Sequence, residues 1–574
     1  MLHRLIQLVQ HQTPSQKVWI KALLCSVLLF VLLAGYLLLA EYVGGYVATY
    51  SGQLWLEVLL ALYLYCLVYS FLRPSRWRVY LAVIPLLLIY LINDVFYLAF
   101  GKVFRLINLH ELPELLEVLP FSYSIPLSLI ILIPVALLLV HVMWRQGRNA
   151  MLIAMPLLVS MLLLYSIPGA FARMLEGASD LVKYSDAKSV ERNGRLTMML
   201  YHEAQRLEAL EELAPYRDRD NYEQEVNRNI QALQPLLDKR NVHLIVLESF
   251  LDPRLFSKLG FSSSPAHPDF DALFGEQLGL SIAPVFGGAT AQAEFEVLCG
   301  VPALELLSSV EFNVFNGSAA LCLPGQLASL GYHSMGSNAY KPNFFNVAVG
   351  YQGAGFNASH FPREFSALGD SYFEFGDPGV EEYLFDQDLF EQNLDYVEKR
   401  LREFPEKPLF NYLITIYGHT PHLLDPDSRP EFIELRSDYP DDHLTRAVNQ
   451  FYYRTEAIAS YVNGLIRIDP ESLIILIADH VPPLRNGPNT YEALAYLDGV
   501  EGAYYHNRLA IIDRGQPMVM PVIHHYEIPT LILNYLSEGG YCKMHGCSFT
   551  GNGDALTKDE QRNAYLRLMA HAAE

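Results

Sequence analysis

The sequence has no block of clustered lysines and arginines in its second half. Basic residues are in the minority throughout, since 41 Lys and Arg stand against 62 Asp and Glu, giving a formal net charge of −21. Nucleic acids bind to clustered positive side chains that neutralise phosphates, so this distribution excludes nucleic acid as a partner. The excess of acidic residues is explained most simply by solubility.

Cysteine is also rare, with six residues in 574. Two of them, Cys25 and Cys66, fall within apolar runs. The other four lie in the more polar remainder of the chain: Cys299, Cys322, Cys542 and Cys547. Four such thiols suit two disulfides formed in an oxidising compartment. The close pair at 542 and 547 could close a small loop; zinc binding is the alternative, but no second pair with matching spacing accompanies it.

Long hydrophobic runs are confined to the first third of the chain. Hydrophobic residues make up 51% of the sequence, and five apolar stretches reach the roughly 20 residues that a membrane-spanning helix needs. They cover approximately residues 18–41, 54–72, 79–100, 123–144 and 150–170. We therefore expect a transmembrane domain of five helices over residues 1–171. The first stretch is too long and too far from Met1 for an ordinary cleaved signal, so it is predicted to be retained.

Basic residues between the predicted spans indicate their orientation. They gather before the first span and in the second and fourth loops: Arg4, Lys17, Lys21, Arg73, Arg76, Arg78, Arg145 and Arg148. The first loop, residues 41–53, has no lysine or arginine. The basic segments should face the cytoplasm, and five spans then place everything after residue 170 outside. We expect a multi-pass protein of the cell inner (cytoplasmic) membrane with a periplasmic or extracellular catalytic domain.

After the predicted spans, the residue composition and pattern of the chain change twice. Residues 172–240 are rich in Leu, Glu, Arg and Gln with helical spacing and are predicted to form linker helices. Over residues 241–574, short apolar runs alternate with helical patterns, which is typical of an α/β fold with a mostly parallel sheet. In such sheets the active site gathers beyond the carboxyl ends of the strands. Polar residues at those ends are therefore the first candidates for function.

Three apolar runs of this region lead to polar residues. The runs cover 242–247, 409–415 and 473–478, and the residues that follow them are Glu248, His419, Asp479 and His480. Hard divalent cations prefer oxygen ligands, and imidazole also suits zinc and other transition metals. Each residue alone is most simply a polar group at a strand end. Together, two carboxylates and an imidazole predict a metal site.

A pair of glycines precedes a candidate nucleophile. Gly287 and Gly288 are followed by Ala289 and Thr290. Glycines let the backbone approach a bulky anion, and a following helix would point free N–H groups at it. A threonine hydroxyl becomes a useful nucleophile when a metal or a base lowers its pKa. The alternative is that Thr290 only caps the helix predicted over residues 291–299.

Several segments, taken in order, resemble the lipoteichoic acid synthase-like branch of the alkaline phosphatase superfamily. The most specific is the glycine–threonine segment with the Glu-Phe-Glu that follows it. The matching segments are 246–250, 287–290, 294–302, 330–332, 386–390, 415 with 419–421, and 478–480. The resemblance covers the whole outer domain and also the five-span anchor.

This resemblance implies a fold and a set of roles. The fold would be the sulfatase-like α/β sandwich of the superfamily, carried by the transmembrane anchor. A divalent metal, manganese before zinc or magnesium, would be held by four residues: Glu248, Thr290, Asp479 and His480. Thr290 would be the nucleophile, and His419 would contact the phosphate or assist proton transfer. Relatives pass a phospho-headgroup from a membrane phospholipid to a glycan or polymer hydroxyl, which makes these molecules the expected partners.

The chain departs from the family at one motif. Relatives commonly carry an aromatic-Asn-Arg sequence that grips the lipid headgroup, whereas the stretch 340–347 here has Val347 at the arginine position. Lys341 and Asn343 are the candidates to replace the arginine, although a lysine does not reproduce a bidentate guanidinium. This departure leaves open a donor headgroup and an acceptor that differ from those of the better-known relatives. The resemblance implies phosphatidylglycerol as the first donor and phosphatidylethanolamine as the next. His422 and His506 are two further candidates to line the substrate cleft.

Three functions remain compatible with the sequence. The first is a transferase that forms a phospho-threonine intermediate and passes the headgroup to a glycan. The second is a phosphodiesterase that uses the same metal and Thr290 with water as acceptor. The third is a non-catalytic membrane protein that binds lipid or polysaccharide. A protein of the third kind has no physical need to keep Glu248, Thr290, Asp479 and His480 together, so an enzyme is expected. The phosphodiesterase fits these residues equally well, and the resemblance favours the transferase.

Overall fold

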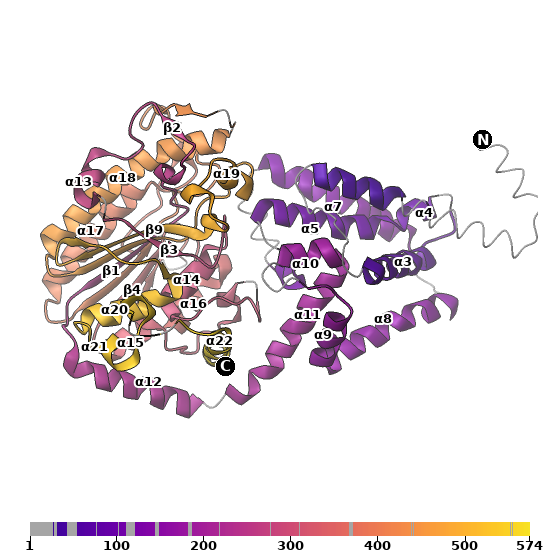
Figure 1. Cartoon of the computed structure of the whole chain (residues 1–574), viewed down its shortest axis with the longest axis horizontal. Coiled ribbons are helices and arrows are strands. Elements are labelled where there is room, and N and C mark those ends of the chain that lie inside the picture. Colours follow the sequence, from indigo (N-terminus) through magenta and orange to yellow (C-terminus); the bar gives the residue numbers. More distant parts are fainter. Residues whose placement is uncertain are drawn as a thin grey trace, which may run out of the picture. The chain divides into compact units, whose positions relative to one another are not determined.

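The computed structural model describes most of the chain and divides it into two compact units, Met1–Glu208 and Ala209–Glu574 (Figure 1). The described residues are 27, 31–42, 54–75, 77–100, 103–110, 121–143, 148–181, 186–216, 219–275, 277–308, 310–366, 371–437, 439, 441–551, 553 and 555–573. The boundary between the units falls inside the stretch 172–240 that was expected to link two domains. Cys25 and the basic residues before the first predicted span lie outside the described residues.

The first unit is helical throughout its described residues. Its main helices are α3 (Leu54–Phe71), α5 (Ile84–Phe100), α7 (Phe121–His141), α8 (Arg148–Ser166), α9 (Pro168–Gly177), α10 (Asp186–Asn193) and α11 (Arg195–Glu212). The described residues also include an apolar helix over Val31–Tyr42 and the short helices α4 (Arg78–Leu81) and η1 (Leu106–His110), and α11 continues past the boundary at Glu208. The helices up to α8 consist largely of apolar residues, as the sequence predicts.

Fewer helices pass a strict test for crossing a membrane than the five that the sequence predicts. Among the described residues, one helix, Arg78–Tyr97, is long and apolar enough. A second candidate is the pair Met151–Ser166 and Pro168–Gly177, which is bent by 113°. Shorter apolar helices cover Val31–Tyr42, Trp55–Phe71 and Ser128–His141. Apolar helices thus lie in each predicted span, but five complete crossings remain a prediction.

Two buried carboxylates fasten the start of α11 to the apolar helices of this unit. Asp94 of α5 accepts hydrogen bonds from the guanidinium of Arg195, the shorter at 2.6 Å, and from Tyr36 at 2.5 Å. Glu57 of α3 accepts from the backbone N–H and the hydroxyl of Thr197, each at 2.9 Å. A buried charge is tolerated when it is paired and hydrogen-bonded, and both carboxylates satisfy that condition.

The second unit is built on one twisted sheet. Within its described residues, nine strands join in the order β11-β3-β9-β8-β1-β6-β4-β5, with β10 paired to β9. The strands are β1 (Val242–Leu247), β3 (Gly279–Ile282), β4 (His333–Asn338), β5 (Ala358–His360), β6 (Leu409–Ile414), β8 (Leu473–Ala478), β9 (His506–Asp513), β10 (Gln516–Met518) and β11 (Ile523–His524). Five neighbouring strands of this sheet, β8, β1, β6, β4 and β5, run parallel, as the sequence predicts. A separate antiparallel pair joins β2 (Gly260–Phe261) to β7 (Leu435–Arg436).

Helices cover both faces of this sheet (Figure 1). They are α12 (Arg219–Leu233), α13 (Pro268–Phe274), α14 (Thr290–Cys299), α15 (Leu323–Ser329), α16 (Val347–Ala354), α17 (Asp386–Glu403), α18 (Asp442–Ile468), α19 (Pro488–Ala493), α20 (Ile528–Leu536), α21 (Gly540–His545) and α22 (Lys558–Ala572). Strand β1 is buried at every position, and its side chains alternate between two cores. Leu244 and Val246 pack in the core that contains α14, α15 and α20, while Ile245 packs in the core that contains α13, α17 and α18. Burial on both faces explains why the strand reads as a continuous apolar run.

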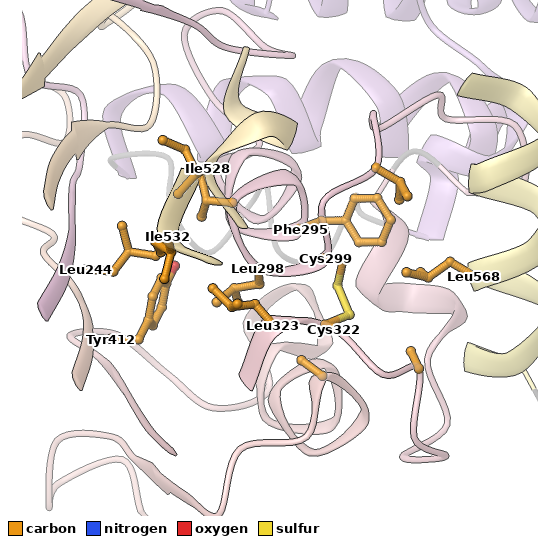
Figure 2. Close-up of a cluster of buried hydrophobic side chains, with 14 of the residues drawn as sticks. Leu244, Phe295, Leu298, Cys299, Cys322, Leu323, Tyr412, Ile528, Ile532 and Leu568 are labelled. Atoms are coloured by element: carbon orange, nitrogen blue, oxygen red, sulfur yellow. A yellow bond between two sulfur atoms is a disulfide. The ribbon is translucent and has the colours of Figure 1, made fainter. Parts of the chain in front are cut away.

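Two disulfides stabilise the second unit. Cys299 pairs with Cys322, and Cys542 pairs with Cys547. Figure 2 shows the first of them at the end of α14, within the apolar cluster that includes Leu298 and Leu323. The polar-region cysteines therefore form two disulfides, and zinc binding at 542 and 547 is not supported.

Candidate active site

The active-site edge of the sheet is set by the register of its three central strands. Strand β1 pairs in parallel with β6 on one side and with β8 on the other. In parallel strands the carboxyl ends meet at one edge, so the residues that follow β1, β6 and β8 come together there. Glu248 follows β1 directly, and Asp479 follows β8 directly. The backbone N–H of Asp479 donates to the carbonyl of Leu247, which places the two strand ends side by side.

Glu248, Asp479 and His480 form a compact cluster at this edge. Their ligand atoms all lie within 4.8 Å of one another, and the three residues are buried. Nε2 of His480 lies 3.2 Å from Oδ2 of Asp479. That same carboxylate oxygen is buried, and no donor among the described residues is hydrogen-bonded to it. A buried carboxylate oxygen without a donor is costly, and a cation would satisfy it.

Thr290 joins the cluster from the first position of α14. Its hydroxyl donates to Oε2 of Glu248 at 2.9 Å and lies 3.4 Å from Nε2 of His480. The residue before it, Ala289, has φ 59° and takes the N-cap position, where no side-chain capping bond forms. The alternative that Thr290 serves as the helix cap is therefore wrong: its hydroxyl faces the cluster, not the helix N–H groups.

The glycine before Thr290 allows a close approach of two loops. Gly287 has φ 68°, in the left-handed region, and a Cβ placed there would lie 2.9 Å from Cβ of Pro483. Its N–H donates to the carbonyl of Val481, just after Asp479 and His480. A glycine at this position thus lets the loop that carries Thr290 pack against the loop that follows β8.

Electrostatics in this cluster favour a bound cation. Burial, and then repulsion from Asp479, raise the pKa of Glu248 above its ordinary range. Burial raises the pKa of Asp479 to about 7, against the lowering effect of two backbone hydrogen bonds. Two carboxylates, an imidazole and a hydroxyl around one point are a donor set that fits a divalent metal such as manganese or zinc. The residues present therefore fit the metal that the sequence predicts.

His419 lies in the loop after β6, at the half-buried rim of the same edge. Its Nδ1 is 2.9 Å from the carbonyl of Thr420, and its ring centroid lies 5.0 Å from that of Tyr383. A bond to a carbonyl needs a hydrogen on Nδ1, which leaves Nε2 to exchange a proton with a ligand. The imidazole is close enough to influence the charge state of Glu248.

The headgroup candidates lie in the loop after β4. Nζ of Lys341 lies 5.5 Å from the ring centroid of Tyr340 and 5.7 Å from that of Phe365. Asn343 is exposed. Val347, at the position of the family arginine, is only 3% exposed and packs in the core with α14. The backbone therefore turns this position away from the surface, and no longer side chain there could be accommodated without moving the core.

The two candidate histidines occupy different settings. His422 is buried, its Nδ1 lies 3.2 Å from Oε1 of Gln450, and burial lowers its pKa to about 3. It borders a cavity with room for about one water molecule, shared with Ser249 and Arg454. His506 is the half-buried first residue of β9, which pairs antiparallel to β8 and so starts near the active-site edge. The substrate contacts expected of Lys341, Asn343 and these two histidines remain predictions.

A hydrogen-bond network that the sequence did not predict supports the backbone of Glu248. The backbone N–H of Glu248 donates to the hydroxyl of Thr415, the first residue after β6, at 3.0 Å. Arg454, in the middle of α18, lies 3.5 Å from the same hydroxyl and forms a buried ion pair with Asp386 at 2.7 Å. Thr415 and Asp386 lie in segments that carry the family resemblance, but nothing in the sequence connects either of them to Arg454.

Comparison with known proteins assigns the fold. Residues 240–532 match the family model of the sulfatases, so the chain belongs to the sulfatase family. This confirms the predicted resemblance to the alkaline phosphatase superfamily and its sulfatase-like α/β domain. The match spans the strands and loops that bring Glu248, Thr290, Asp479 and His480 together.

Two curated relatives match part of the chain. A putative cyclic β-1,2-glucan modification protein of Rhizobium meliloti is 24% identical over 268 residues, covering 46% of this chain and 38% of the relative. A lipoteichoic acid synthase of Staphylococcus saprophyticus is 25% identical over 350 residues, covering 56% of this chain and 50% of the relative. The chain thus spans half or less of the length of these relatives.

Among solved structures, the Streptococcus pyogenes phosphoglycerol transferase GacH in complex with sn-glycerol-1-phosphate is 17% identical. The superposed region covers 63% of this chain and 92% of the GacH chain, with a TM-score of 0.47. The lipoteichoic acid synthase LtaP from Listeria monocytogenes is also 17% identical, covers 54% of this chain and 78% of its own, and has a TM-score of 0.41.

Proposed function

We propose that this protein transfers a phospho-headgroup from a membrane phospholipid to a hydroxyl of a glycan, through a phospho-threonine intermediate. The observation that carries the proposal is the hydroxyl of Thr290 held 2.9 Å from Glu248 inside a buried acidic cluster. A hydroxyl in that setting is a nucleophile with a base beside it. The names of the curated relatives, one a glycan modification protein and one a lipoteichoic acid synthase, support the same chemistry.

In the first step, Oγ1 of Thr290 attacks the phosphorus of the lipid. Its proton moves to Oε2 of Glu248, which already accepts the hydrogen bond from this hydroxyl, and from there to solvent, so that this oxygen is free to hold a cation. The bond between phosphorus and the diacylglycerol oxygen breaks, and His419 supplies the proton that this oxygen takes up. The headgroup remains on Thr290 as a phosphodiester.

In the second step, a hydroxyl of the acceptor attacks the same phosphorus. His419 takes the proton of that hydroxyl, and the oxygen of Thr290 leaves and regains a proton from solvent. The headgroup is now joined to the glycan, and all side chains have returned to their starting states. A divalent metal held by Glu248, Thr290, Asp479 and His480 would supply the positive charge that stabilises the phosphoryl oxygens in both steps.

The membrane setting is part of the proposal. Helices α7 and α8 expose large apolar side chains, including Leu132, Ile133, Leu158 and Leu162, which are 54–65% exposed. Apolar surface of this extent is stable in contact with lipid and not with water. We place five spans in residues 1–171, linker helices in 172–240 and the catalytic domain in 241–574, outside the inner membrane. The disulfides Cys299–Cys322 and Cys542–Cys547 support an oxidising compartment.

The donor and the metal are proposed in order of preference. Phosphatidylglycerol is the first donor and phosphatidylethanolamine the second, with manganese preferred over zinc and magnesium. Lys341 and Asn343, beside the aromatic loop after β4, are the residues that would contact the headgroup, and His422 and His506 are the weaker candidates. The acceptor is a glycan or polysaccharide hydroxyl.

The full chain in detergent micelles tests the proposal. It is incubated with phosphatidylglycerol or phosphatidylethanolamine, with Mn²⁺ or EDTA, and with or without a soluble glucan. Thin-layer chromatography then follows diacylglycerol. We expect Mn²⁺-dependent diacylglycerol release that is lost in Thr290→Ala, and headgroup recovered on the glucan.

The same experiment separates the alternatives. Free headgroup phosphate with no modified glucan would replace the transferase with a phosphodiesterase that uses the same site. No diacylglycerol from either lipid, with Mn²⁺ bound, would leave a non-catalytic lipid-binding or glycan-binding protein and overturn the proposal.

A further inference from the structure

Ser249 contacts each of the three clustered candidate ligands. Its backbone N–H donates to Oδ1 of Asp479 at 2.7 Å, and its hydroxyl donates to Oε1 of Glu248 at 2.8 Å. The same hydroxyl lies 3.4 Å from Nδ1 of His480. The residue is 4% exposed. One small side chain and its own amide therefore touch residues from two different strand ends.

These contacts sort the polar atoms of the cluster into two sets. Oε1 of Glu248, Oδ1 of Asp479 and Nδ1 of His480 all face Ser249. Oδ1 of Asp479 also accepts from the backbone N–H of His480 at 2.6 Å, and Nδ1 of His480 lies 3.1 Å from the carbonyl of Val481. The opposite atoms face one another and Thr290. Oε2 of Glu248 accepts from the Thr290 hydroxyl, and Nε2 of His480 lies 3.4 Å from that hydroxyl. Oδ2 of Asp479 lies 3.2 Å from Nε2 of His480.

The backbone of Ser249 adopts a conformation that non-glycine residues avoid. Its φ is 46°, in the left-handed region. Residues held in this region persist only when the surroundings fix them, and such residues gather at functional sites. Here the surroundings include the Thr415 hydroxyl, which accepts from the N–H of the preceding Glu248, and Asp479, which accepts from the N–H of Ser249 itself. The turn therefore directs both the amide and the hydroxyl of Ser249 toward the cluster.

We infer that Ser249 is a positioning residue for the metal site. It holds one oxygen of Glu248 and one of Asp479 by hydrogen bonds and lies beside Nδ1 of His480, so that the other atom of each is presented to a single cation without further rearrangement. It does not itself bind the cation, because its hydroxyl is committed to the oxygen of Glu248 that faces away from Thr290. The inference rests on the proposed function only in that the cluster binds a divalent metal.

The physical consequence is a higher affinity of the site for the metal. Ligands that are already hydrogen-bonded in place lose less freedom when the metal binds, and removing such an outer partner typically weakens metal affinity by about 10–100-fold. Ser249→Ala removes the hydroxyl and keeps the amide. Ser249→Gly also removes the hydroxyl but accepts φ 46° without strain, so it separates the hydrogen bond from the backbone conformation.

The full chain is stripped of metal with EDTA and dialysed. Mn²⁺ is then titrated into it, and calorimetry measures the binding affinity. We expect both variants to bind Mn²⁺ about 10–100-fold more weakly than the wild type, while the metal-free thermal midpoint of Ser249→Gly stays at or above that of the wild type. The control is Ser537→Ala, a buried serine whose hydroxyl donates to the carbonyl of Leu533, and its affinity should be unchanged.

Wild-type affinity in Ser249→Gly would overturn the inference, even if Ser249→Ala failed to fold. A wild-type protein that binds none of Mn²⁺, Zn²⁺ and Mg²⁺ would overturn it as well. A wild-type protein that binds Mn²⁺ but releases no diacylglycerol would refute the proposed function alone, and the role of Ser249 in metal affinity would stand.

Discussion

The hydroxyl of Thr290 and the carboxylate of Glu248 lie 2.9 Å apart, although 42 residues separate them in the sequence. The strand that ends before Glu248 and the helix that begins at Thr290 are both fixed by the sheet and its covering helices. Nucleophilic displacement at phosphorus needs at least a hydroxyl and a carboxylate base at hydrogen-bonding distance from that hydroxyl. The cluster beside them is the site that we propose for a divalent cation.

The metal-free protein should lose stability as the pH rises. Burial raises the pKa of Asp479 from 3.8 to about 7, so the folded state holds this proton more tightly than the unfolded chain does. Its contribution to stability is therefore complete below about pH 4 and is lost as the pH rises through 7. Thermal midpoints in EDTA should fall over this range, and the gain from Mn²⁺ should grow over it, because the metal replaces the proton.

Asp479→Asn is the matching variant for this prediction. Glu294 and Glu296, whose pKa values burial raises to about 7 and about 8, give a similar pH dependence that remains in the variant. The fall of the midpoint with pH should therefore be shallower in Asp479→Asn and should no longer respond to Mn²⁺. An identical pH profile in the two proteins would contradict the assigned role of Asp479.

The buried ion pair of Arg454 and Asp386 should be essential for stability. Both side chains are at most 3% exposed, and the arginine also reaches the hydroxyl of Thr415. Removing one partner leaves an uncompensated buried charge, so Asp386→Ala should lower the free energy of unfolding by about 3–5 kcal/mol. Chemical denaturation of the full chain in detergent measures the change. Arg402→Ala, which breaks an exposed pair with Glu398, should cause little change, and equal losses would refute the prediction.

Gly418 should tolerate no side chain. A Cβ there would lie 1.9 Å from the carbonyl oxygen of Glu248 and 2.2 Å from Nη1 of Arg454. Gly418→Ala must displace the Glu248 backbone and the Arg454 side chain, so we expect weaker Mn²⁺ binding and a loss of about 1–3 kcal/mol in stability. Calorimetry and thermal unfolding report the two effects.

Gly279→Ala is the control for that substitution. A Cβ at Gly279 would meet the carbonyl of Leu509 at 3.5 Å, an ordinary contact, so both properties should stay near wild type. If Gly418→Ala behaves like this control, then the close packing of Gly418 against Glu248 is not a requirement of the site.

The disulfide at the end of α14 should stabilise the helix that carries Thr290. The helix begins at Thr290 and ends at Cys299, which pairs with Cys322, 23 residues further along the chain. Replacing both cysteines by alanine should lower the free energy of unfolding by about 3 kcal/mol in the chain-entropy account. The disulfide between Cys542 and Cys547 closes a shorter loop, so replacing both of these cysteines by alanine should lower the free energy of unfolding by less. The reverse order would contradict this account.

The sequence predicted the cluster because strand ends are visible in it. The runs before Glu248 and Asp479 are apolar on both faces, which marks them as central parallel strands and places their following residues at one edge. The glycine–threonine segment could be recognised but not placed, since only the fold shows that α14 begins beside β1.

Other features depend on packing that no local pattern reveals. Arg454 lies in the interior of α18, where an arginine would ordinarily face water, and its partner Asp386 begins a different helix. Ser249 has a functional conformation only because Asp479 and Thr415 hold the turn. Helix α8 ends where Pro168 starts a helix in another direction, which apolar composition alone could not indicate.

Mass spectrometry of Thr290 tests the central claim most directly. The full chain is incubated in micelles with phosphatidylglycerol, phosphatidylethanolamine and Mn²⁺ without acceptor, quenched in acid, digested and sequenced. The account predicts a peptide in which Thr290 alone carries a phosphoglycerol or phosphoethanolamine group, absent with EDTA and released by added glucan. Diacylglycerol formation with Thr290 unmodified at every time point would contradict it.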